Sequence, residues 1–204
     1  MIIIKLKKII STLIEMRFKL TSMLMILIIK ILNKEATIGK GFTSNGLMSL
    51  NLHRNSTILF GQKVVFNNTT RSNFIGLNKK STIFVGNNAK LEIGDNSGFS
   101  NVSLHAIKAI KIGKYCNIGG NCFIWDSDFH PIDYIKRREH IESKINSLPV
   151  VIGDDVFIGA NSIILKGVSI GNMSVIGAGS VVTKSIPDKE LWAGNPAKFI
   201  RKIV

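Results

Sequence analysis

The 204-residue chain has few cysteines, few aromatic residues and few acids. Its two cysteines, Cys116 and Cys122, are too few for a disulfide framework or a zinc knuckle, and they fit buried positions in a protein kept reduced. Aromatic residues make up only 7% of the chain and no nucleic-acid-binding motif is present, so no nucleic-acid partner is expected. Acids number 13 against 27 lysines and arginines, and the net charge of +14 favours anionic partners such as phosphates, nucleotides or acidic lipids.

Long uncharged apolar runs are also missing. The longest one in the Ile-, Leu- and Met-rich N-terminal segment is Leu20–Ile29, about half of the roughly 20 residues that a membrane-spanning helix needs. Charges recur through this segment and no small-residue cleavage site follows it, so a cleaved signal peptide fits poorly. With the reduced cysteines, this predicts a cytoplasmic protein.

Residues 1–35 are predicted to form one amphipathic helix. Its polar residues recur at three- and four-residue steps with one gap, and they are Lys5, Lys8, Thr12, Glu15, Lys19, Ser22, Lys30 and Asn33. Residues 1–40 hold eight lysines and arginines against two glutamates, which suits a helix lying on the anionic inner face of the cytoplasmic membrane. A helix packed on its own domain or on a neighbouring subunit explains the pattern equally well, and both interpretations stay open.

From Val151 onward the sequence repeats every six residues. Aliphatic residues recur at this interval without a slip, at Ile152, Ile158, Ile164, Ile170, Ile176 and Val182. Glycine follows four of them, at Gly153, Gly159, Gly171 and Gly177. Neither the 3.6-residue period of a helix nor the two-residue period of a strand explains this spacing. A triangular coil does, because each side takes six residues, one aliphatic per side points inward, and 18 residues make a rung.

The six-residue repeat extends upstream. Ile112, Ile118 and Ile124 are again six apart, and Ile75, Ile93 and Ile112 follow one another at 18 and 19 residues, which assigns one rung to each interval. The sequence therefore predicts an all-β fold, a hexapeptide-repeat parallel β-helix with about seven rungs.

Between Ile124 and Ile152 no repeat is visible over 28 residues. Residues 125–150 are predicted to leave the coil as an external loop, the one long insertion expected, and insertions in solenoids often carry the working face. The predicted organisation is a helical segment at 1–35, a β-helix at 36–187 and a C-terminal tail or short helix at 188–204.

The predicted loop opens with WDSDFHPID, which contains His130. Pro131 pushes the preceding residue towards an extended conformation, and a stiffened imidazole with a near-neutral pKa suits a general base. Asp126 and Asp128 lie four and two residues before His130, and they are predicted to hold its other ring nitrogen and fix the tautomer.

Metal chemistry and a serine nucleophile are both disfavoured. A metal site needs converging ligands, but His53 and His105 lie on rungs and His140 lies late in the loop. The GAGS stretch at 177–180 sits inside the repeat, without the strand-to-helix context of a nucleophile turn. We therefore expect no metal.

Residues 112–200 resemble the hexapeptide-repeat acyltransferases, in the branch of maltose and galactoside O-acetyltransferases and of the capsule, colanic-acid and O-antigen acetyltransferases. The shared motifs are DxDFHP, VxIGDDVFIGANSIILKGVSIG, VIGAGSVVTKSIP and AGNPAK. The resemblance implies a left-handed β-helix and a homotrimer with active sites between subunits. It also implies transfer of acetyl from acetyl-CoA to a carbohydrate hydroxyl in surface polysaccharide synthesis, with His130 as the general base and no covalent intermediate.

The same resemblance implies the binding residues. Those implied for the pantetheine groove of acetyl-CoA are Ala160, Ser162, Ala178 and Gly179. Those implied for the adenosine end and its phosphates are Thr183, Lys184, Lys198 and Arg201. The candidates on the acceptor side are Asn101, Ser103 and Phe157, the last standing where many relatives have Trp. His105 is a further candidate for the second polar residue of the family's active site.

Other functions of the same fold remain as alternatives. One is N-acetylation of an amino-sugar nucleotide, and another is a non-catalytic scaffold held at a membrane by residues 1–33. The γ-class carbonic anhydrases bind zinc through three histidines, and the histidine spacing of this chain does not match that arrangement.

Overall fold

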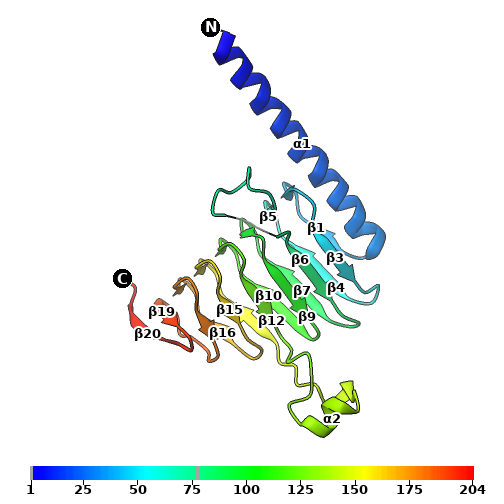
Figure 1. The fold of residues 1–204 in the computed structure, drawn as a ribbon, viewed down its shortest axis with the longest axis vertical. Helices are drawn as coiled ribbons and strands as arrows, with labels where there is room; N and C mark the ends of the chain where they lie inside the picture. The colour runs from blue at the N-terminus through cyan, green and yellow to red at the C-terminus, as the bar shows by residue number, and fades with distance from the viewer. Residues whose placement is uncertain (1, 77–78) are drawn as a thin grey trace.

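The computed structural model describes residues 2–76 and 79–204, and it shows a long helix followed by a three-sided coil of short strands (Figure 1). The helix is α1 (Ile2–Leu32). Sheet A contains β1 (Thr37–Ile38), β4 (Thr57–Phe60), β7 (Lys90–Ile93), β10 (Ala109–Ile112), β13 (Val150–Ile152) and β16 (Ser169–Ile170). Sheet B contains β2 (Thr43–Asn45), β5 (Val65–Asn67), β8 (Gly98–Ser100), β11 (Asn117–Ile118), β14 (Phe157–Ile158), β17 (Val175–Ile176), β19 (Glu190–Gly194) and β20 (Ala197–Lys202). Sheet C contains β3 (Ser49–Leu52), β6 (Thr82–Val85), β9 (Ser103–Ala106), β12 (Phe123–Trp125), β15 (Ile163–Ile164) and β18 (Val181–Val182).

Each turn of the coil adds one strand to each sheet, and neighbouring strands from β1 to β19 pair in parallel. Within the described residues this gives six complete rungs, from β1–β3 to β16–β18, and a partial seventh. The prediction of a parallel β-helix preceded by a helix is confirmed.

The six-residue repeat forms the core of the coil. Ile112, Ile152 and Ile170 are register partners in sheet A, and all three are at most 2% exposed. Sheet C contains the equivalent column of Ile124, Ile164 and Val182. One inward aliphatic residue per side thus stacks on its equivalents in the rungs above and below, which buries apolar surface along the whole coil.

The glycines of the repeat are required by the close approach of successive rungs. A Cβ on Gly153 would lie 2.6 Å from the Asn172 side chain and 2.9 Å from its backbone nitrogen. Neither Gly153 nor Gly159 has a positive φ, so space rather than backbone conformation selects glycine there.

The assignment of Ile75 to the repeat is wrong. Ile75 lies outside the strands and is 52% exposed, and the position one rung before Ile93 is held by Phe60. Ile75 instead lies in a second insertion between β5 and β6, described at residues 68–76 and 79–81, so its 18-residue spacing from Ile93 does not correspond to a rung. The loop at 125–150 is therefore not the one long insertion in the chain.

The prediction of a C-terminal tail or short helix at residues 188–204 is also wrong. β19 pairs in parallel with β17, and β20 returns antiparallel to β19, with Trp192 opposite Phe199. In sheet B the edge of β17 is therefore covered by β19, and β20 covers β19 in turn.

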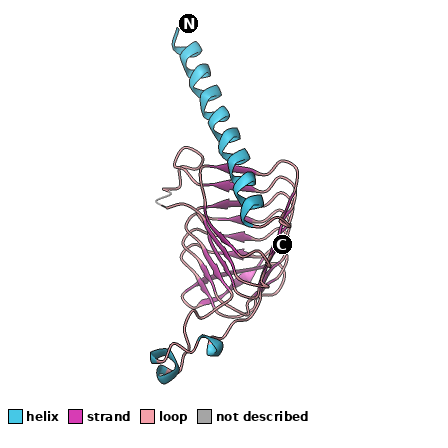
Figure 2. Cartoon of the chain, turned by 90° about the vertical axis from the view of Figure 1, so that its right-hand side faces the viewer, coloured by secondary structure: helices cyan, strands magenta, loops and turns pink. Residues whose placement is uncertain are grey.

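The C-terminal half of α1 closes the other end of the coil (Figure 2). Met25 and Ile29 are 1% and 0% exposed against the first rung. The Ser44 backbone N–H donates to Ser22 Oγ at 2.9 Å, and Asn33 Nδ2 donates to the Ser56 carbonyl oxygen at 2.8 Å. Ser22 and Asn33 were expected on a polar face of the helix, but both are buried and bind the coil.

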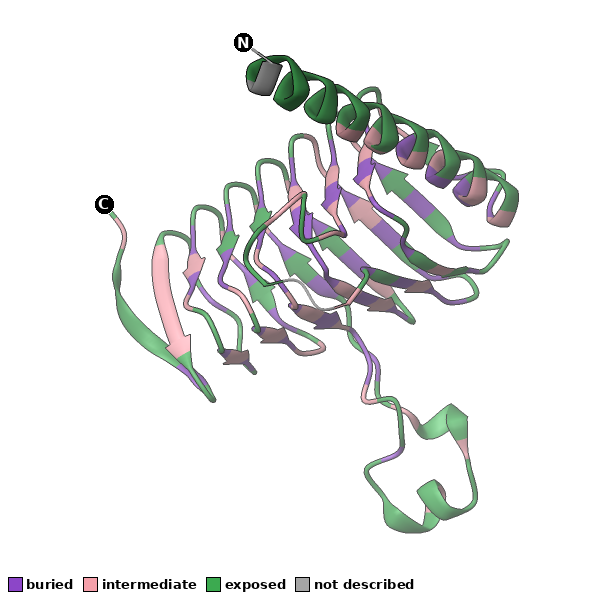
Figure 3. Ribbon diagram, turned by 45° about the horizontal axis from the view of Figure 1, so that its top comes forward, coloured by how far each residue is buried: buried purple, intermediate pink, exposed green. Residues whose placement is uncertain are grey.

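The opposite side of α1 is exposed (Figure 3), and the residues on it are apolar. Its exposed residues recur at steps of three and four and are 45–66% exposed, and we call them the apolar stripe: Leu6, Ile9, Leu13, Met16, Leu20, Leu24, Leu27 and Ile31. With 100° per residue, this stripe lies opposite the face that carries Met25 and Ile29. Among the described residues, no helix has the length and apolar character to span a bilayer.

Candidate active site

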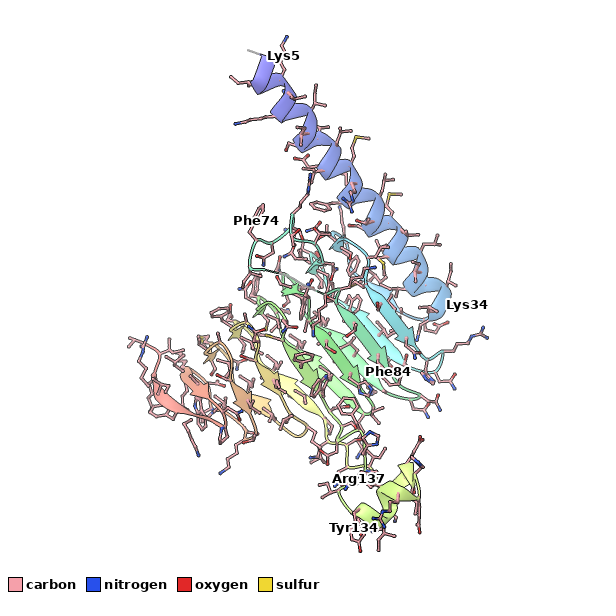
Figure 4. All side chains as sticks on the ribbon, viewed as in Figure 1. Lys5, Lys34, Phe74, Phe84, Tyr134 and Arg137 are labelled. Atoms are coloured by element: carbon pink, nitrogen blue, oxygen red, sulfur yellow. The ribbon has the colours of Figure 1, made fainter. Side chains whose placement is uncertain are left out.

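The loop that contains His130 leaves sheet C after β12 and returns at β13, and its far end carries α2 (Tyr134–Arg138) and a short 3-10 turn (Glu142–Lys144) (Figures 1 and 4). The outgoing and returning segments of the loop run antiparallel at its base. Ser127 bridges Ser147, and the Leu148 N–H donates to the Asp126 carbonyl oxygen at 2.9 Å. The loop therefore begins as a defined stem on the corner between sheets C and A.

Asp126 anchors this corner and does not contact His130. Its side chain is fully buried, and its two carboxylate oxygens accept N–H donors from Ile107, Lys108 and Ala109 at 2.7–2.8 Å. These donors belong to the turn between β9 and β10, one rung earlier. The predicted role of Asp126 in orienting His130 does not hold, because both of its oxygens are committed to backbone.

Asp128 is paired with a lysine. Its Oδ1 lies 2.6 Å from Lys166 Nζ, and its Oδ2 is buried with no hydrogen-bond partner among the described residues. Lys166 lies on the turn between β15 and β16, so the ion pair ties the loop to the following rung. Asp128 thus holds the stem, and no bond between its carboxylate and the His130 ring is present in the described part of the chain.

His130 lies at the surface between a buried proline and a partly exposed phenylalanine whose ring contacts two other rings. Pro131 is buried, and Phe129 has a φ of +62° with its ring 4.5 Å from His105 and 5.2 Å from Trp125. The backbone N–H of His130 donates to the Asp128 carbonyl oxygen at 2.7 Å. The residues on both sides of His130 are therefore fixed, while its side chain is exposed.

A second group of predicted residues lies along the corner between sheets B and C. One residue per rung there has a positive φ, and we call Asn101, Asn121, Asn161 and Gly179 the corner column. Each of the last three donates its backbone N–H to a carbonyl of the preceding rung at 2.8–3.1 Å. Ala160 and Ala178 directly precede Asn161 and Gly179, so three of the four predicted pantetheine residues share this corner.

Ser162 differs from those three residues. It is fully buried, and its hydroxyl donates to the Gly177 carbonyl oxygen at 3.1 Å. Its side chain stabilises the rung and is not offered to a ligand.

Asn101 is the most unusual residue of the corner column. It is 1% exposed and has a φ of +49°, yet both polar atoms of its amide lack a hydrogen-bond partner among the described residues. Leaving a buried amide unpaired costs stability, which marks Asn101 as a candidate for a ligand contact. Nothing in the sequence pattern alone distinguished Asn101 from Ser103 or His105.

The remaining predicted residues do not form one cluster within a protomer. Ser103 lies on sheet C, where its hydroxyl accepts from Thr82 Oγ1 at 2.9 Å, whereas Phe157 lies on the outer face of sheet B. Of the predicted adenosine-end residues, Thr183 and Lys184 follow β18, whereas Lys198 and Arg201 lie on β20 of sheet B.

The described residues of the second insertion, 68–76 and 79–81, which the sequence did not reveal, contact the same corner. Asn73 Nδ2 donates to Ser100 Oγ at 2.9 Å, one residue before Asn101. Lys79 Nζ lies 3.6 Å from the centre of the Phe123 ring on β12. This insertion therefore lies beside the Asn101 end of the corner column.

Neither thiol nor metal chemistry has a site among the described residues. Burial raises the pKa of the Cys122 thiol to about 11, so this thiol is protonated at neutral pH and does not act as a nucleophile. In residues 2–76 and 79–204 no three side chains of His, Cys, Asp or Glu converge as metal ligands.

Comparison with known proteins identifies the repeat. Residues 149–184 match the family model described as the hexapeptide repeat of succinyl-transferase. The chain is thus similar to the hexapeptide-repeat acetyltransferases. It is similar to a candidate acetyltransferase of Saccharomyces cerevisiae, with 43% identity over 117 residues that cover 56% of this chain and 57% of that protein. The match thus spans little more than half of the yeast protein.

Two crystal structures extend this family resemblance. A Vibrio cholerae hexapeptide-repeat acetyltransferase in complex with acetyl coenzyme A is 36% identical, with a TM-score of 0.51 over 56% of this chain and 61% of that one. A maltose O-acetyltransferase of Clostridium difficile is 28% identical, with a TM-score of 0.54 over 87% of this chain and 73% of that one.

Proposed function

We propose that this protein is an acetyl-CoA-dependent O-acetyltransferase that acts on a carbohydrate hydroxyl, with His130 as the general base. The observation that carries the proposal is the position of His130. Its exposed imidazole lies between a buried proline and a phenylalanine whose ring contacts His105, on a stem anchored by Asp126 and Asp128. Such rigid positioning of a proton acceptor is what direct transfer requires.

In this mechanism the imidazole of His130 takes the proton of the sugar hydroxyl as the oxygen attacks the thioester carbonyl. The tetrahedral intermediate places negative charge on the former carbonyl oxygen, and preorganised N–H donors would stabilise it. The amide of Asn101 and the backbone of the corner column are the candidates. Collapse breaks the C–S bond, the thiolate of CoA takes the proton from the imidazolium, and the acetyl ester is released.

The corner column supports the proposed site for the donor. From Asn101 to Gly179 it spans three rung spacings, or about 14 Å, a length suited to an extended pantetheine arm. Ala160, Ala178 and Gly179 have small side chains, which leave the Gly179 end of the column open. The cationic side chains of Lys198 and Arg201, on β20 past this end, are the candidates for binding the phosphates of CoA. Lys184 and Thr183 would have to come from the other side of sheet C or from another subunit.

A homotrimer is part of the proposal, because one protomer does not complete the site. The loop with His130 leaves from the corner between sheets C and A, whereas the corner column lies between sheets B and C. A second copy of the chain would bring its loop to the corner column of the first. We also carry over the left-handed course of the coil from the family.

N-acetylation of an amino-sugar nucleotide remains the alternative, and the product separates the two. Purified protein with acetyl-CoA is expected to release CoA in the presence of a sugar acceptor and to form a product that mild alkali cleaves, since esters are labile and amides are not. An alkali-stable product would establish the N-acetyl alternative. Failure to bind CoA in titration calorimetry would instead favour the non-catalytic scaffold.

The apolar stripe supports a place at the inner face of the cytoplasmic membrane, with an acceptor used in surface polysaccharide synthesis. Lys5, Lys8 and Lys19 flank the stripe along one edge, so an in-plane helix would put ammonium groups at the level of anionic headgroups. The same charges would repel other basic surfaces of this +14 chain, which disfavours the stripe as a contact between copies.

We expect the protein to sediment with vesicles containing phosphatidylglycerol but not with pure phosphatidylcholine vesicles. The double change Leu13→Asn and Leu20→Asn removes two central residues of the apolar stripe and should abolish sedimentation. Leu47→Asn, which removes an exposed leucine outside α1, is the matched control. Equal binding by the double variant, or self-association of the wild type through α1 without lipid, would show that the stripe has another occupant.

A further inference from the structure

The outer face of sheet C carries a groove with a volume of about 400 Å³, beside the root of the loop with His130. Its outward residues form two columns along the coil axis. The first column consists of hydroxyl residues in register, namely Ser49, Thr82 and Ser103. The second begins at Asn51 and continues with the aromatic rings of Phe84, His105 and Trp125.

The rings of Phe84 and His105 contact each other directly, and Phe129 links His105 to Trp125. Phe84 and His105 are stacked, with ring centres 4.4 Å apart and planes inclined by 9°. Phe129 lies 4.5 Å from His105 and 5.2 Å from Trp125, and it closes the groove at the loop. Phe84 lies on the side of the coil that faces the loop (Figure 4). The next residue after Phe129 is His130, so the ring column leads directly to the proposed base.

Packing alone does not explain these rings. The apolar core lies on the inner face, where Ile83 and Leu104 are 2% and 1% exposed, and the stacked rings occupy the outer face. Burial lowers the pKa of His105 against the weaker opposing effect of Asp126, so its ring is neutral at neutral pH and stacks without a charge. Its Nδ1 is buried with no partner in the described part of the chain.

Carbohydrate is the ligand whose chemistry matches both columns. A pyranose ring has a face of C–H bonds that packs on aromatic rings and a rim of hydroxyls that bond to hydroxyl and amide groups, and aromatic-lined grooves with a few placed polar groups are the usual form of such sites. The groove runs over four strands, β3 to β12, or about 14 Å by strand spacing, which exceeds one pyranose ring.

We propose that the groove on sheet C binds an extended carbohydrate of two or more residues, so that the acceptor is an oligosaccharide or polysaccharide rather than a free monosaccharide. This inference rests on the proposed function, because His130 as the base determines which end of the glycan reacts. The glycan runs along the ring column, and its end sugar passes Phe129 to reach His130. Ser103, which the sequence nominated for the acceptor, lies within this groove.

Titration calorimetry of the full chain, saturated with CoA, tests the proposal with a fixed panel of maltohexaose, chitohexaose and an α2,8-linked sialic acid hexamer, each against its monosaccharide. We expect at least one hexasaccharide to bind tenfold or more tightly than its monosaccharide. Phe84→Ala should weaken that binding by about tenfold, as should His105→Ala, whereas Leu59→Ala on the outer face of sheet A should not.

The proposal is overturned if no hexasaccharide of the panel shows a length advantage, or if Phe84→Ala and Leu59→Ala bind equally. It is also overturned if Phe84→Ala changes the elution volume in size-exclusion chromatography, since the groove would then be an interface between copies. These results are separable from the proposed function. Ester formation on a monosaccharide without a length advantage would support the acetyltransferase and contradict the glycan groove. Length-dependent glycan binding without CoA binding would support the groove and contradict the acetyltransferase.

Discussion

His130→Ala is expected to lower the rate of acetyl transfer by about 10²–10⁴-fold, the usual contribution of a positioned general base. The substitution removes the imidazole that would accept the hydroxyl proton, and the loop stem does not depend on it because the packed neighbours are Phe129 and Pro131. The measurement is CoA release at saturating acetyl-CoA, with binding of CoA and the elution volume unchanged.

His140→Asn is the matched control for that result. His140 belongs to the same loop and is exposed, with a φ of +52° that asparagine tolerates. We expect the His140 variant to retain nearly the full rate. Equal rates for wild type and His130→Ala would remove the direct-transfer mechanism, and equal losses in both variants would point to a general effect on the loop.

Asp126→Ala is expected to destabilise the protein by about 2–4 kcal/mol, because three backbone N–H groups lose a charged acceptor. For a chain of this size, thermal unfolding should shift by about 2–4 °C per kcal/mol. Differential scanning calorimetry measures the shift. Asp133→Ala, in the exposed part of the same loop, removes the cap of the short helix α2 and an exposed ion pair with Lys136, and it should cost about 1 kcal/mol.

The two aspartate variants also distinguish anchoring from catalysis. If Asp126 anchors the corner, its loss lowers thermal stability whether or not acetyl-CoA is present. An Asp126→Ala protein with wild-type thermal stability and a greatly reduced rate would restore the interpretation that Asp126 orients His130.

The sequence predicted the coil because its core depends on one residue type at one spacing. Ile152, Ile158 and Ile164 point inward wherever the period holds, so the repeat and its interruption after Ile124 were both readable. Ile75 shows the limit of this reasoning. It stands 18 residues before Ile93 by coincidence, inside an insertion that has no period of its own.

The roles of the acidic residues could not be predicted, because they depend on backbone groups and on side chains from other rungs. The sequence spacing placed Asp126 and Asp128 near His130, but their actual partners are a turn one rung earlier and Lys166 one rung later. The two faces of α1 posed the same difficulty. Ile, Leu and Met occur on both faces of α1, so hydropathy alone does not show which face contacts the coil. The burial of Met25 and Ile29 in the structure identifies it.

The number of rungs between α1 and the loop that contains His130 sets the distance between them. α1 closes the first rung and the loop leaves the fourth, so three rung spacings, or about 14 Å, separate the helix-covered end from the stem of His130. Because each rung contacts only its neighbours, a rung of 18 residues could be added or removed without altering either end. Each such change would move His130 relative to the apolar stripe in steps of about 5 Å. The number of rungs therefore sets the distance between the proposed base and any surface that α1 contacts.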